Sequence, residues 1–231
     1  MTSVAIINRS TVLTDDAVRV AVAALQKQVI KEFADSGWPQ AEVAFLDPTA
    51  AINPGQWSLI LLDDTDQAGA LGYHDLPQAE NGMPIGYVFA KTDAQYGLSW
   101  TVTASHELLE MLADPWIEKV ALHQIGETGA LLYSYEVCDA CEDDALGYDI
   151  NGVRVSDFVY PAWFQDWRPN GSTKFDHTGA IDAPFRLAGG GYISTFTPGT
   201  GWQQVSAPGR NARMAYRVMN AGFKRSHWRI K

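Results

Sequence analysis

The order of apolar segments in the first quarter of the chain constrains the fold more than any other feature. Residues 4–8 form a short β-branched run that is typical of a buried strand. Thr14 can cap a helix whose apolar repeat begins with Val18 and Val22 and ends before Gly37. Two further strands are predicted at residues 42–46 and 57–62. This β-α-β-β order indicates an α/β (α+β) layer with a mixed, twisted sheet.

A second long helix is predicted over residues 99–112. Val102, Leu109 and Leu112 would form its core-facing stripe, and Asp114 followed by Pro115 would end it. Upstream of this helix, residues 69–74 and residues 83–90 are predicted to be extended. They flank a turn-rich stretch at residues 77–82. After residue 115 the chain is rich in Gly, Pro and aromatic residues. We therefore expect an N-terminal α/β region at 1–115 and an irregular, β-rich region at 116–231, which completes the same domain or forms a second lobe.

The helix at 99–112 carries the most specific chemical signal in the sequence. His106 and Glu110 are four residues apart and so project from the same face, the spacing with which two side chains bind one metal ion. Glu107 lies beside them. The motif H-E-x-x-H places two zinc ligands around a general base, and here Glu110 stands where that motif has its second histidine.

This motif and the order of elements resemble the zincin metalloproteases. The resemblance covers roughly residues 4–115 and implies a mixed, twisted sheet packed on two long helices. It also implies that residues 84–90 form the edge strand beside the substrate cleft, where an extended peptide can add to the sheet.

A closer resemblance is to poorly characterised bacterial and phage-associated proteins that carry Ser-His-Glu-x-x-Glu, then Asp-Pro, then Glu-x-x-Asp. This chain has Ser105 before His106 and Glu107, then Asp114-Pro115, and then Glu136 and Asp139. The resemblance implies a shared site rather than a known reaction.

The resemblance implies that the metal ligands are His106, Glu110 and Glu136, with Asp139 as a further ligand or as the acceptor that orients His106. The expected cofactor is a divalent metal, zinc first. Because two carboxylates make the site harder than His-His-Glu, manganese or calcium can compete. In an active enzyme Glu107 is the expected catalytic base, and a peptide or protein is the expected substrate.

An oxyanion-stabilising partner is also needed, and the sequence does not select one among six chemically suitable side chains. These are Tyr133, Tyr135, Tyr148, Tyr160, His123 and His177. His177 is in addition an alternative metal ligand.

Three alternatives to a metallopeptidase are open. Glu107 and Glu110 could be exposed residues on a charged helix face, with His106 in the first turn of the helix bonded to Ser105 or a neighbour. The chain could be a non-catalytic zincin-derived structural or binding module, for example in a phage particle or another assembly. It could also bind or cleave glycans with a groove formed by aromatic residues, although core packing is the preferred interpretation of Phe158, Tyr160, Trp163, Phe164 and Trp167.

Composition narrows the classes of partner. A formal net charge of −10 disfavours nucleic acid, and the basic stretch at 210–231 is interpreted as a solvated end. No secretory signal and no apolar run of membrane-spanning length is evident, so the default location is cytoplasmic, with a virion or non-classical export as alternatives. Cys138 and Cys141 form a single C-x-x-C among acidic residues, which favours two semi-buried thiols over a redox pair.

Overall fold

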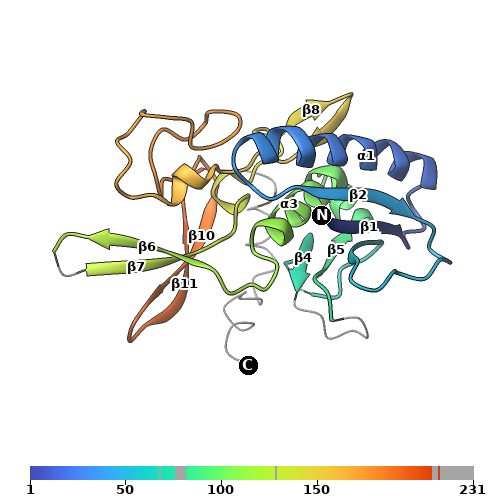
Figure 1. Ribbon diagram of the computed structural model, residues 1–231, viewed down its shortest axis with the longest axis horizontal. Helices are drawn as coiled ribbons and strands as arrows, with labels where there is room; N and C mark the ends of the chain where they lie inside the picture. The colour runs from blue at the N-terminus through green and yellow to red at the C-terminus, as the bar shows by residue number, and fades with distance from the viewer. Residues whose placement is uncertain (68, 76–81, 128, 210–212, 214–231) are drawn as a thin grey trace.

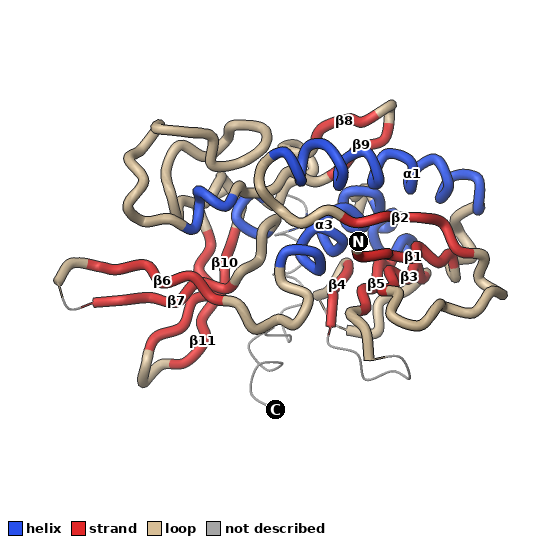
Figure 2. The backbone as a smooth tube through the Cα atoms, in the orientation of Figure 1, coloured by secondary structure: helices blue, strands red, loops and turns tan. Residues whose placement is uncertain are grey.

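The computed structural model describes residues 1–231 apart from 68, 76–81, 128, 210–212 and 214–231. Figures 1 and 2 show helices and strands of an α/β region on one side and antiparallel hairpins on the other. The helical elements are α1 (Asp15–Lys27), η1 (Gln28–Phe33), α2 (Ala90–Gln95), α3 (Trp100–Ala113), η2 (Asp139–Cys141) and η3 (Pro161–Phe164). Seventeen elements are present in the described residues.

The α/β region is built on a five-stranded mixed sheet in the order β2-β1-β3-β5-β4. Its strands are β1 (Thr2–Asn8), β2 (Ala41–Leu46), β3 (Trp57–Leu62), β4 (Gly72–Asp75) and β5 (Ile85–Phe89). The first four in this order pair in parallel, whereas β4 pairs antiparallel to β5. The prediction that residues 84–90 form the edge strand is therefore wrong. That segment is the internal strand β5, and β4 is the edge.

The prediction of two long helices is also not met. Thr14 caps α1 by accepting a hydrogen bond from the Ala17 amide at 3.2 Å, as the sequence predicted. The 13 residues of α1 then continue as the six-residue π-helical segment η1, so this is the one long helical stretch among the described residues. Helix α3 has 14 residues and α2 has six.

Helix α3 is buried on every side from Val102 to Ala113. It packs against β4 and β5 of the sheet and against the short strand β9 (Val153–Val155), which pairs with β8 (Tyr148–Ile150). A helix buried all round holds its polar residues inside the protein, where they need partners or a ligand.

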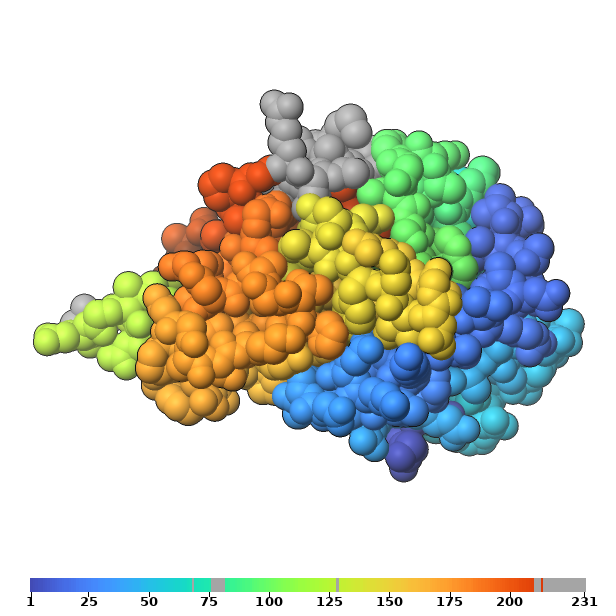
Figure 3. Space-filling view, turned by 90° about the horizontal axis from the view of Figure 1, so that it is seen from above, coloured from blue at the N-terminus to red at the C-terminus, as the bar shows by residue number. Residues whose placement is uncertain are grey.

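The second half of the chain forms a four-stranded antiparallel sheet in the order β11-β10-β7-β6. Its strands are β6 (Val120–Ile125), β7 (Gly129–Ser134), β10 (Tyr192–Thr197) and β11 (Gly201–Ser206). The β6–β7 hairpin projects from the body of the molecule, as Figure 3 shows. The base of this second sheet belongs to the same hydrophobic core as the first sheet. One cluster of buried apolar side chains extends from Val4 in β1 to Ile193 in β10.

The predicted aromatic packing is confirmed in most positions. Phe158, Trp163 and Phe164 are buried, but Trp167 is 67% exposed.

Among the described residues, no helix combines the length and the apolar character that crossing a membrane requires. Most of the predicted turn at 77–82 lies outside the described residues.

Candidate metal centre

The three residues of the helix motif are buried in the structure. His106 and Glu107 are each 2% exposed, and Glu110 is fully buried. The alternative that Glu107 and Glu110 are exposed residues on a charged helix face is therefore wrong. Burial of one imidazole and two carboxyl groups is costly unless charges compensate one another or a cation is bound.

The residue before the motif fixes the orientation of α3. The Ser105 hydroxyl donates to Gln28 Oε1 at 2.7 Å and accepts the Ser156 amide at 3.1 Å. Gln28 also donates to the Ser156 carbonyl oxygen at 3.0 Å. Since Gln28 begins η1, this network links the long helical stretch to α3 directly beside His106.

The downstream acidic residues follow β7. Glu136 lies in the loop after the strand, and Asp139 begins the η2 turn. Gly191 allows this turn to pack closely, because a Cβ there would lie 2.2 Å from the Ala140 carbonyl oxygen. The Ala188 amide donates to the same carbonyl oxygen at 2.9 Å. The loop before β10 thus packs closely on η2.

His106 lies between carboxylates from the two elements. Its Nε2 is 3.2 Å from Glu110 Oε2 and 3.3 Å from Asp139 Oδ1, while its Nδ1 is 3.9 Å from Glu142 Oε1. By strict geometric criteria Nε2 has no hydrogen-bond partner among the described residues, although both carboxylates lie close enough to raise the pKa of the imidazole.

These distances fit ligands that share an ion. Two ligand atoms that each lie about 2.1 Å from one divalent ion stand about 3.0–3.4 Å apart. Imidazole nitrogen and carboxylate oxygen are suitable donors for zinc, and the added carboxylates suit manganese. His106 and Glu110 therefore have the chemistry and the spacing of two metal ligands, and Asp139 Oδ1 lies at a similar distance from the same His106 nitrogen.

A second histidine, His74 on the edge strand β4, faces the same carboxylates. Its Nδ1 is 3.3 Å from Glu107 Oε2 and 3.8 Å from Glu110 Oε2, and its Nε2 is 3.7 Å from Glu136 Oε2. His74 was not predicted as a site residue. The available signal was its position at the end of the extended segment predicted at residues 69–74, but the pairing of that strand at the sheet edge depends on distant segments.

The predicted ligands thus separate into two neighbouring groups that share Glu110. His106, Glu110 and Cys138 form one buried group whose potential ligand atoms lie within 4.8 Å of one another; His74, Glu107 and Glu110 form the other. Asp139 belongs beside His106, whereas Glu136 lies beside His74.

The electrostatics of the site reflect this crowding. Burial by itself lowers the pKa of His106, but the carboxylates of Glu110, Asp139 and Glu107 raise it well above the ordinary value. Burial raises the pKa of Glu110, which His106 opposes and Asp139 and Glu136 reinforce. The carboxylates therefore stabilise positive charge at His106, the place where a divalent cation would meet them.

Cys138 contributes to the site mainly through its backbone. Its amide donates to Glu110 Oε1 at 3.2 Å, which orients that carboxylate. Both cysteines are fully buried, more than the sequence indicated, and burial followed by the charge of Glu110 raises the pKa of the Cys138 thiol well above its ordinary value. Glu142 and the possible thiol ligand Cys138 were also missed by the sequence analysis.

The six candidate oxyanion partners have structural contacts elsewhere. His177 stacks on Phe158 with ring centroids 5.2 Å apart, and His123 stacks on Phe185 at 4.4 Å. The Tyr148 hydroxyl donates to Glu32 at 2.6 Å. The other three tyrosines pack against aromatic rings of the second half; they are Tyr133, Tyr135 and Tyr160. His177 is thus held in aromatic packing rather than beside His106.

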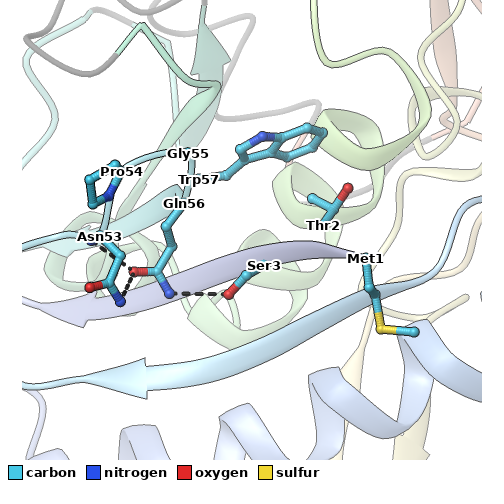
Figure 4. A pocket seen from close by; sticks show the side chains of 8 residues that line it. All are labelled: Met1, Thr2, Ser3, Asn53, Pro54, Gly55, Gln56 and Trp57. Carbon is cyan, nitrogen blue, oxygen red and sulfur yellow. Dashed lines mark hydrogen bonds between the residues drawn. The ribbon is translucent and has the colours of Figure 1, made fainter.

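A surface hollow of about 560 Å³ lies where β1 and β3 begin, as Figure 4 shows. None of its eight lining residues has an ionisable side chain. Comparison of the chain with models of protein families, with curated proteins and with solved structures finds no match. Function is therefore inferred from the site itself.

Proposed function

We propose that this protein is a zincin-like metallopeptidase with a variant His-Glu-x-x-Glu site. His106, Glu110 and Asp139 are the protein ligands of a divalent ion, zinc first, and Glu136 is a further carboxylate available to it. The observation that carries the proposal is the spacing at the buried His106 Nε2, which lies 3.2 Å from Glu110 Oε2 and 3.3 Å from Asp139 Oδ1 in a cluster that could hold a metal ion.

Glu107 is the proposed general base. It follows His106 on α3, and His74 Nδ1 lies 3.3 Å from its carboxylate, so an imidazole fixes its orientation. A bound divalent ion would polarise the scissile carbonyl group and acidify water. Glu107 would accept the proton of that water and deliver it to the leaving amine.

The edge strand β4 is the proposed docking strand for a peptide. It pairs on one side with β5, and it presents His74 to the site. An extended peptide that adds to its other side would run past Glu107, and backbone hydrogen bonds would give affinity without requiring one side chain.

A specific observation favours a second candidate, a non-catalytic module that holds a stabilising ion. His106, Glu107, Glu110 and Asp139 are each at most 2% exposed, so substrate access requires movement of the surroundings. In this function the ion would link α3 to η2 and stabilise the fold.

Elemental analysis of the full chain after exposure to zinc, manganese or calcium and exhaustive dialysis tests the metal site. We expect one retained ion per chain, and its loss in His106→Ala and Glu110→Ala. His123→Ala is the matched control, because His123 stacks on Phe185 away from the cluster, and it should retain the ion. An ion-free parent protein would refute the site.

A peptide-library cleavage assay then separates the two functions. Glu107→Gln should keep the ion and lose cleavage, whereas Glu118→Gln, at an exposed glutamate, should keep both. If the metal-loaded parent cleaves no peptide, the stabilising ion is the better account.

A further inference from the structure

A second buried polar site lies at the start of α3 and contains Arg213. This residue is 1% exposed; the rest of the basic stretch at 210–231, which was predicted to be a solvated end, lies outside the described residues. Its Nη1 donates to Thr103 Oγ1 at 2.7 Å, its Nη2 donates to the Ser99 carbonyl oxygen at 3.0 Å, and its Nε donates to Asp144. We call the site formed by Asp93, Ser99, Thr103 and Asp144 the Arg213 pocket.

The pocket is held together by bonds that do not involve Arg213. The Ser99 amide donates to Asp144 Oδ2 at 2.9 Å, and the Thr103 hydroxyl donates to Asp93 Oδ1 at 3.0 Å. Asp93 is fully buried, and its Oδ2 has no hydrogen-bond partner among the described residues. The nearest guanidinium nitrogen is 3.9 Å from Asp93 Oδ1. The pocket thus has an acceptor left for a further donor.

The Arg213 pocket adjoins the candidate metal centre. Thr103 and Glu107 are four residues apart on α3, a rise of about 6 Å, and they lie on the same helix face. Both contact Gly72 of the edge strand, since a Cβ at Gly72 would lie 2.7 Å from Thr103 Cγ2 and 2.9 Å from Glu107 Cγ. A single extended chain along β4 can therefore reach both sites.

We propose that the Arg213 pocket is a guanidinium-binding subsite of the peptide cleft, filled by Arg213 in the free protein and by an arginine side chain of a bound polypeptide. That the bound arginine belongs to a peptide substrate rests on the proposed function. That the site binds a guanidinium group does not. The carboxylates of Asp93 and Asp144, the Thr103 hydroxyl and the Ser99 carbonyl oxygen are acceptors arranged around a planar donor, which arginine matches better than lysine.

Charge and spacing support a basic polypeptide as the ligand. Residues 210–231 contain seven of the 17 basic residues and none of the 27 acidic ones, so Arg213 comes from a segment opposite in charge to the rest of the chain. In an extended peptide, side chains on one face repeat at about 6.8 Å. That repeat is close to the separation of Thr103 and Glu107 along the helix.

Calorimetric titration of the metal-free full chain tests the binding aspect. The probe is a blocked pentapeptide with one central arginine between glycines, and the control peptide has citrulline, the neutral isostere. We expect Arg213→Ala to bind the arginine peptide at least tenfold more tightly than wild type does, and at least tenfold more tightly than it binds the citrulline peptide. Adding Asp93→Asn to Arg213→Ala should abolish this preference.

Arg213→Lys covers the case in which Arg213→Ala does not fold, because lysine keeps the charge and the stem but not the planar donor. It should also bind the arginine peptide at least tenfold more tightly than wild type does. A folded variant that shows no preference for arginine over citrulline would overturn the proposal and leave Arg213 as a permanent internal link. Arginine binding without a retained metal would instead refute the proposed function alone.

Discussion

Two buried acidic groups in this protein are built in opposite ways. Asp157 and Asp176 are both fully buried, and all four of their carboxylate oxygens accept hydrogen bonds from nearby chain. At the candidate metal centre, the carboxylates of Glu110 and Asp139 instead converge on one nitrogen, His106 Nε2, at 3.2 and 3.3 Å. Saturated carboxylates stabilise a loop, whereas converging carboxylates are suited to hold an ion.

The largest expected effect tests the structural role of the Asp157–Asp176 pair. Asp176 accepts the Ala180 amide at 2.8 Å and the Ile181 amide at 2.9 Å. Asp176→Ala leaves both amides without this acceptor, and we expect it to lower the free energy of unfolding by about 3 kcal/mol or more. Urea denaturation measures the change.

The matched control is Asp182→Ala. Asp182 is exposed and forms a surface ion pair with Arg186, so its loss should cost about 0.5 kcal/mol or less. If the two variants lose the same stability, the pair does not hold the loop.

The next largest expected effect is stabilisation of the protein by zinc, which should depend on His106 but not on Asp157. Saturating zinc, at about 100 times its dissociation constant, should add about 2.7 kcal/mol and raise Tm by about 5–10 °C. His106→Ala should abolish this rise, because it removes a ligand. Asp157→Asn should retain it, since Asp157 binds only neighbouring chain. Thermal unfolding with and without zinc measures the rise in Tm. If both variants lose this rise equally, the His106 cluster and the Asp157–Asp176 pair do not have separate roles in metal binding and loop stability.

The sequence could predict features that depend on residues close together in the chain, but not those that depend on contacts between distant segments. The α1 cap, α3, and the pairing of His106 with Glu110 depend on spacing along one helix, so the sequence could predict them. That Asp139 lies next to His106 was implied only by resemblance. His74 and Arg213 reach their places through contacts between distant segments, and no local pattern marks such contacts.

The mistaken edge strand has the same cause. Residues 83–90 and 69–74 were both predicted as extended, and both form strands, β5 and β4. Which of the two lies at the edge depends on whether β5 pairs with β3, a choice made by sheet packing and not by either strand's own residues.

A smaller effect comes from pH. Burial, together with the hydrogen bond and charge of Asp176, raises the pKa of Asp157 to about 7 from an ordinary value of 3.8. The folded state therefore holds an extra proton between these values, and the stability from it is present below about pH 4 and is lost as pH rises toward 7.

Asp157→Asn imitates the protonated form and should remove this dependence. We expect its stability relative to wild type, in urea denaturation of metal-free protein, to increase by about 2 kcal/mol between pH 5 and pH 8. A constant difference across that range would show that Asp157 does not hold the proton.

The smallest expected effect distinguishes Asp139 from Cys138 as the third ligand beside His106 and Glu110. The amide of Cys138 orients Glu110, and alanine keeps that amide. Cys138→Ala should therefore cost about 1–2 kcal/mol through the small cavity it leaves, yet retain the ion. Asp139→Asn removes a charged ligand and should weaken metal retention at least tenfold. If Cys138→Ala instead loses the ion and Asp139→Asn keeps it, the thiolate is the ligand, and the site is a softer one that favours zinc over manganese and calcium.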